Sequence, residues 1–71
     1  MDDIKQTVGH HTYFNIGAFD AREKVQRNCP DGWRAGVKIG SEPLPAGAVL
    51  VGQVKVHHGD PPYPLYVYPA A

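Results

Sequence analysis

The sequence has one cysteine, Cys29, so no disulfide can form within the chain. No stretch approaches the eighteen or so consecutive apolar residues that identify a membrane-spanning helix. The first residues also lack the basic region and apolar run of a secretory signal. We therefore expect no membrane partner and no export by a visible signal. A lone thiol is typical of a reducing compartment.

Net charge is absent too, because seven Lys and Arg balance seven Asp and Glu. Such a chain has no global field to gather nucleic acid or anionic membrane. The 71 residues fit one domain, and a domain near this size buries only about 60% of the surface that its unfolded chain exposes. With a disulfide excluded, the usual further supports are a metal or a partner chain. Association with another chain is the simpler expectation.

Three segments show the two-residue alternation of apolar and polar side chains that predicts strands. They are residues 12–19, 33–39 and 48–58. The apolar faces of the last two segments predict the core. The predicted core residues are Trp33, Val37, Ile39, Leu50, Val54 and Val56.

The segments between these strands have turn and helix signals. Asp20 followed by Glu23 has the form of a helix start, which predicts one or two helical turns up to Asn28. A charged edge strand is the alternative for residues 21–28. Residues 29–32, with the sequence Cys-Pro-Asp-Gly, predict a turn, and residues 40–47 predict a loop.

The C-terminal segment, residues 61–71, contains four of the seven prolines. Proline is confined to polyproline-like or edge-strand geometry, so we predict an extended arm beyond a β domain of residues 1–60. Its large side chains make a solvated tail costly, and tyrosine is enriched at interfaces. The predicted anchors on another chain are Tyr63, Leu65, Tyr66, Val67 and Tyr68. A tail folded back on its own domain is the alternative.

The predicted fold class is therefore mostly β: a small open barrel or sandwich of four to five antiparallel strands with one short helix and an extended Pro-rich C-terminal arm.

Histidine occurs in two adjacent pairs, and imidazole is a good zinc ligand. The pairs are His10-His11 and His57-His58, with Asp60 or Cys29 as a further ligand. Neighbouring residues on a strand point to opposite faces, so at most one histidine of each pair could meet at an ion. Exposed strand-end histidines are the favoured interpretation, and we predict neither metal nor cofactor.

Catalysis needs a nucleophile and a base placed together in a pocket. Cys29 with a histidine is conceivable, but the Pro-Asp-Gly that follows is a turn without a catalytic motif. We therefore predict a non-enzyme with no small-molecule substrate. Residues 22–38 carry five basic against two acidic side chains, beside Trp33. A solvated charged face with a core Trp is favoured over a nucleic-acid surface.

Residues 44–52, with the sequence Leu-Pro-Ala-Gly-Ala-Val-Leu-Val-Gly, resemble the "L-x-A-G-T-V-L-G" segment of the head decoration (cement) proteins of tailed bacteriophages. Ala48 stands where that pattern often has Thr. The resemblance implies a non-enzymatic β protein on a capsid lattice, often an oligomer.

The leading hypothesis is a structural binding protein of a virion, most concretely capsid decoration or another phage structural accessory. Its partners would be further copies of the chain or capsid proteins, in the virion or the host cytoplasm. The first alternative is a small adaptor or inhibitor of a host or phage protein that contacts nucleic acid through residues 22–38. The second is a small metal-binding protein that uses the histidine pairs.

Overall fold

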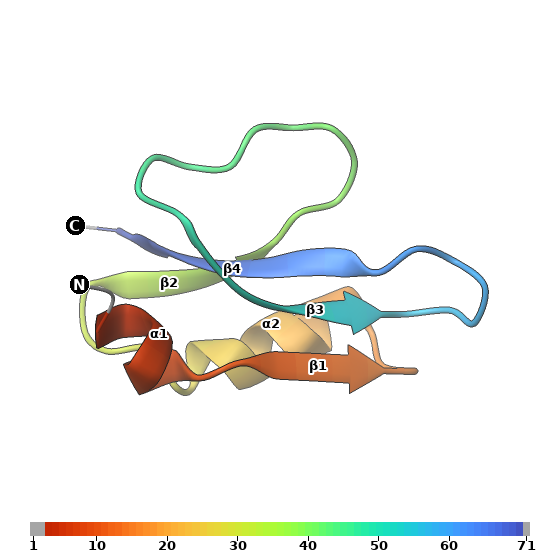
Figure 1. The fold of residues 1–71 in the computed structure, drawn as a ribbon, viewed down its shortest axis with the longest axis horizontal. Helices are drawn as coiled ribbons and strands as arrows, with labels where there is room; N and C mark the ends of the chain where they lie inside the picture. Colours follow the sequence, from red (N-terminus) through yellow and green to blue (C-terminus); the bar gives the residue numbers. More distant parts are fainter. Residues whose placement is uncertain (1–2, 71) are drawn as a thin grey trace.

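A computed structural model of the chain describes residues 3–70. Within these residues, two helices and four strands follow one another (Figure 1). They are α1 (Asp3–Val8), β1 (His11–Phe14), α2 (Ala18–Gln26), β2 (Trp33–Val37), β3 (Val49–Lys55) and β4 (Tyr63–Pro69).

The four strands form one open sheet with the order β1-β3-β4-β2. β1 pairs with β3 in parallel, whereas β4 pairs antiparallel with both β3 and β2. The prediction of a strand-rich fold is confirmed, but the sheet is mixed and its two ends do not meet. The predicted open barrel or sandwich of antiparallel strands is wrong, because the strands form a single sheet in which β1 is parallel to β3. The described residues also form two helices where one was predicted.

The core lies between one face of the sheet and the helices. α2 contributes Ala21 and Val25, which are one helical turn apart and fully buried. The facing strands contribute small aliphatic side chains, and α1 adds Val8. The buried sheet residues are Ala35, Val51, Val54, Leu65 and Val67.

The predicted helix is confirmed, and the edge-strand alternative for residues 21–28 is wrong. α2 begins at Ala18, two residues before the predicted cap, with Gly17 in extended conformation at its N-cap. The predicted strand over residues 12–19 is correct only in its first part, because β1 ends at Phe14. Asn15 has a φ of 60°, and this left-handed residue turns the chain away from the sheet.

The predicted C-terminal arm is wrong for residues 63–69, which form β4 between β3 and β2. Leu65 and Val67 are fully buried in the core of the same chain. The boundary predicted at residue 60 therefore divides one sheet. Proline does not prevent this pairing, because a proline still has a carbonyl oxygen that can accept a hydrogen bond. The carbonyl oxygen of Pro64 accepts from Lys38 N–H at 2.9 Å.

The β2–β3 connection, residues 38–48, crosses β4, because β2 and β3 flank that strand and run in the same direction. Figure 1 shows this loop on the side of β4 away from α1 and α2. Ile39 lies in the loop and is 42% exposed, so its assignment to the core is wrong. The strand ends two residues before it.

A β-bulge near the start of β3 explains a second core error. The register with β4 shifts between Leu50 and Gly52, so Val51 and Val54 both face the helices although they are three positions apart in the sequence. Leu50 faces away and is 55% exposed. Of the other predicted core residues, Val54 is fully buried, and Trp33, Val37 and Val56 pack against the core while half-buried.

Candidate interaction surface

The face of the sheet away from the helices carries several large, partly exposed side chains. Successive residues of a strand point to opposite faces. Because Leu65 and Val67 face the core, Tyr66 and Tyr68 of β4 must lie on the other side. Their ring centroids are 5.8 Å apart. The two tyrosines thus form an aromatic pair on this face, which we call the open face although the β2–β3 connection crosses β4 on the same side (Figure 1).

Leu50 extends the aromatic pair across β3, because it is the cross-strand partner of Tyr66. On the other side of Tyr66, Gly36 of β2 provides room for the ring. We call Leu50, Tyr66 and Tyr68 the open-face patch. Phe14 lies on the same face at the far end of β1, opposite Lys55, and is 61% exposed.

Charged side chains of the strands on this face are basic. Arg34 is the cross-strand partner of Tyr68, and Lys55 lies beside Phe14. The acidic residues of the described chain belong to helices, turns and loops instead. A partner of the open face would therefore meet apolar and aromatic side chains flanked by positive charge.

The basic side chains of residues 22–38, which the nucleic-acid alternative requires, are not brought together on one face. Arg22, Lys24 and Arg27 belong to α2 and its C-terminal end, on one side of the sheet, whereas Arg34 faces the other side. Trp33 is half-buried and packs against the core on the helix side of the sheet. Arg22 instead lies over the ring of the exposed Phe19, 5.9 Å from its centroid.

The histidine pairs lie at different places along β3. His11 pairs with Gly52, whereas His57 and His58 follow the strand in an exposed turn. Five residue steps separate Gly52 from His57, which corresponds to roughly 16 Å of extended chain. His11 Nε2 instead lies 2.7 Å from the carbonyl oxygen of Val8, and its ring stacks on Tyr13. The fold therefore separates the ligands that the metal hypothesis requires.

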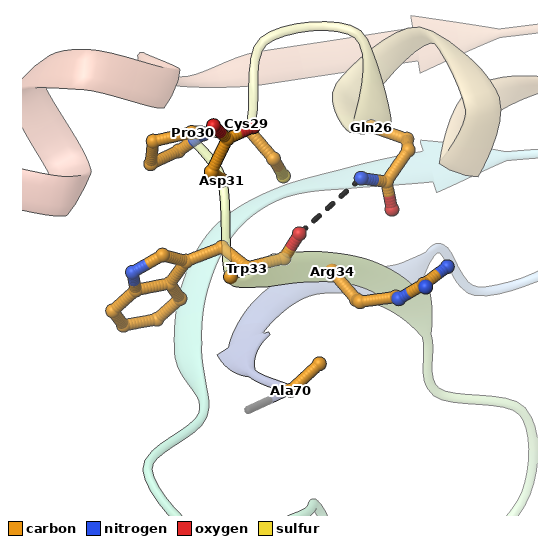
Figure 2. A pocket seen from close by; sticks show the side chains of 8 residues that line it. Gln26, Cys29, Pro30, Asp31, Trp33, Arg34 and Ala70 are labelled. Atoms are coloured by element: carbon orange, nitrogen blue, oxygen red, sulfur yellow. Dashed lines mark hydrogen bonds between the residues drawn. The ribbon is translucent and has the colours of Figure 1, made fainter.

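A hollow of about 320 Å³ lies beside the turn after α2 (Figure 2). Cys29 lines it, together with Gln26, Asp31 and Arg34. The Cys29 thiol lies 3.6 Å from the Val25 carbonyl oxygen as a hydrogen-bond donor. Burial raises the pKa of this thiol, which favours the protonated form over the nucleophilic thiolate. None of the four histidines lines the hollow, so it does not bring together the Cys–His pair that the sequence alone left conceivable.

The side chain of Gln26 binds the free edge of β2. Its amide nitrogen donates to the carbonyl oxygen of Trp33 at 3.3 Å (Figure 2), and its amide oxygen accepts from Ala35 N–H at 2.8 Å. Sequence reasoning missed this contact, because a glutamine near the end of a helix has no local signal that identifies its tertiary partner.

The five predicted interface anchors divide into two groups. Leu65 and Val67 are buried within the chain and are wrong as anchors, because alternation along a central strand turns them inward. Tyr63 packs against the same core. Tyr66 and Tyr68 lie on the open face, where contact with a partner stays a prediction. Sequence reasoning placed Leu50 in the core, on the same face as Val54. It assumed a regular strand, in which residues 50 and 54 share a face, whereas the bulge between them turns Leu50 outward.

Among residues 3–70, no three His, Cys, Asp or Glu side chains are grouped so that they could hold a metal ion. No helix in the same part of the chain has the length and apolarity to cross a membrane. Comparisons of the chain with protein-family models, with curated proteins and with solved structures found no match.

Proposed function

We propose that this chain is a non-enzymatic structural binding protein of a larger assembly, most concretely a decoration or other accessory protein of a phage virion. The observation that carries the proposal is the open-face patch, in which Leu50 is 55% exposed beside Tyr66. Aromatic residues are enriched at protein interfaces, whereas acidic residues are depleted there. A protein partner is the occupant that this patch fits.

The position of Leu50 supports this role. Its side chain is excluded from the core by the bulge in β3, so it contributes little to the stability of the free chain. Burying a leucine side chain is worth about 1.5–3 kcal/mol, which becomes available when a partner covers it. The segment that resembles head decoration proteins, residues 44–52, ends in this strand.

The surroundings of the potential catalytic groups agree with a binding role. The raised pKa of the Cys29 thiol favours its protonated form, and the histidine pairs lie at separate places along β3. The proposed partners are other protein chains, further copies of this chain or capsid proteins. The proposed location is the virion or the host cytoplasm.

The proposal is tested by counting copies of the chain in the particle with which it copurifies, using native mass measurement. We expect Leu50→Ser to reduce the copy number at least tenfold, because it places a hydroxyl where a buried contact is needed. Gln53→Ser is the matched control, because Gln53 is exposed on the same strand and the same face. It should leave the copy number unchanged.

Both variants should retain the circular dichroism spectrum of the wild-type chain, since neither residue belongs to the core. A wild-type chain that is absent from every purified particle would contradict the proposed function. Equal incorporation of Leu50→Ser and wild type would show that the open-face patch is not the contact.

A further inference from the structure

The contact of Gln26 with β2 takes the place of a neighbouring strand. β2 is an edge strand, with β4 on one side. Hydrogen bonds from Lys38 N–H to Pro64 O and from Ala70 N–H to Gly32 O show that the even-numbered residues turn their backbone groups toward β4. The odd-numbered residues of β2 therefore direct theirs outward. Gln26 binds two of these outward groups, Trp33 C=O and Ala35 N–H.

The outward backbone N–H and C=O groups of β2 are complementary to those of a second, antiparallel copy of β2. If two copies of β2 pair about Ala35, each Ala35 N–H donates to the Ala35 carbonyl of the other copy. Each Val37 N–H likewise donates to the other copy's Trp33 carbonyl, as in a regular antiparallel ladder. The two acceptors and two donors of one copy thus match those of the second copy, as a two-fold interface requires.

The side chains of such a pair also fit. Arg34 of one copy would lie opposite Gly36 of the other, so the two arginines would not face each other directly, and like charges directly opposite are destabilising. Trp33 would lie opposite Val37, which gives an aromatic with β-branched pair, one of the favourable cross-strand combinations. The zero formal net charge adds no general repulsion between copies.

We propose that the β2 edge is a pairing site for a second copy of this chain, and that the side chain of Gln26 keeps the site closed in the free protomer. Gln26 occupies Ala35 N–H and Trp33 C=O, and the symmetric pair needs both groups. The two copies must therefore displace both Gln26 side chains before they can pair. Exposed sheet edges are templates for further pairing, and proteins cover them for this reason.

The test is the dimer dissociation constant of the full chain, measured by sedimentation equilibrium. We expect Gln26→Ala to lower this constant at least tenfold, because the two outward groups of β2 no longer have an internal partner. Gln26→Leu, which keeps most of the side-chain volume without the amide, should have the same effect. Gln53→Ala removes an exposed glutamine from a central strand and should leave the constant unchanged.

A second substitution locates the contact. Val37→Pro, combined with Gln26→Ala, removes an outward N–H that takes no part in pairing with β4, and proline is tolerated on an edge strand in this position. We expect it to return the dimer dissociation constant to the wild-type value or above. Leu50→Ser in the same background should leave the dimer intact, which separates this edge from the open-face patch of the proposed function.

Three results would overturn the proposal. Gln26→Ala could remain as monomeric as the wild type, or its dimer could be unaffected by Val37→Pro, which would place the contact elsewhere. Unfolding of both Gln26→Ala and Gln26→Leu would show that the amide maintains the fold of the protomer instead of closing an edge.

Discussion

The ring of Tyr66 lies across Gly36 on the neighbouring strand. The two residues are cross-strand partners in the β2–β4 ladder, and a β-carbon on residue 36 would come within 2.6 Å of the ring carbon Cε1. Gly36 is buried for this reason although it has no side chain. The absence of a side chain at this position thus sets the orientation of one member of the open-face patch.

The first prediction follows from this contact. Gly36→Ala should displace the Tyr66 ring and destabilise the protein by about 1 kcal/mol or more, from rotamer strain and lost packing. In a Tyr66→Ala background the same substitution should be neutral or stabilising, because alanine is better than glycine inside a strand by roughly 0.5–1 kcal/mol. Urea unfolding of the four proteins gives the coupling energy, and additive effects would show that the ring does not depend on Gly36.

The second prediction concerns the approach of β1 to β3. A β-carbon on Gly52 would collide with the backbone carbonyl of His11. A backbone carbonyl in a strand cannot relieve the clash by a rotamer change, as a side chain can. Gly52→Ala should therefore cost about 3 kcal/mol or more, a large part of the roughly 4–10 kcal/mol expected for a domain of this length.

Gly17→Ala is the matched control for Gly52→Ala. Gly17 has a φ of −66°, and a β-carbon on this residue would have Asp20 Oδ2 as its nearest atom, at 3.6 Å, which is an ordinary contact. We expect the control to change the free energy of unfolding by less than about 1 kcal/mol. Similar urea midpoints for both variants would mean that β1 does not pass so close to residue 52.

The local elements could be predicted because their signals are local. The alternation from Trp33 predicts β2, the Asp20 start predicts α2 to within two residues, and the Cys-Pro-Asp-Gly turn joins them as expected. The place of β4 could not be predicted in this way. Four prolines suggest an arm or an edge, whereas the central position of β4 depends on pairing with two strands that are distant in sequence.

The candidate surface was less predictable than the fold. The tyrosine-rich end of the sequence draws attention to Tyr66 and Tyr68, but it does not separate them from Leu65 and Val67 of the core. Gly52 inside the β3 sequence is a local signal for a bulge, but the outward position of Leu50 follows from the register between β3 and β4, which is not a local property. The Gln26 contact likewise depends on how α2 packs beside β2, a tertiary relationship between residues 26 and 35.

The third prediction concerns the Cys29 thiol. Because burial raises its pKa, the folded protein should react with a disulfide reagent more slowly at neutral pH than the same chain unfolded in urea. The folded-state rate should rise to half its maximum at a higher pH than the unfolded-state rate.

The same shift affects stability. Folding favours the protonated thiol, so the contribution of Cys29 to the free energy of unfolding should decline as the pH rises past the ordinary pKa of a thiol. Cys29→Ser should abolish the reaction and this part of the pH dependence, whereas equal rates for the folded and unfolded chains would contradict the prediction.

The fourth prediction concerns the C-terminal residues. Deletion of residues 61–71 should unfold the whole chain, because β4 lies between β3 and β2 and would leave both without their shared partner. The deletion also removes Leu65 and Val67, two of the fully buried side chains of the core. The measurement is the amide chemical-shift dispersion of the truncated chain, which should collapse to the narrow range of an unfolded protein. If the truncated chain kept the amide chemical-shift dispersion of the full chain, residues 61–71 would be an arm that the fold does not need.

A pair of point substitutions distinguishes the two faces of β4 without deleting it. Leu65→Ala should cost about 2–5 kcal/mol, the usual cost of truncating a fully buried leucine. Tyr68→Ala, on the open face, should cost clearly less, because Tyr68 is only half-buried. If a partner covers the open face, the order reverses when binding is measured: Tyr68→Ala should then weaken association by about 2 kcal/mol. Equal unfolding costs at both positions would mean that β4 is buried on both faces, and that the open face is occupied by the chain itself.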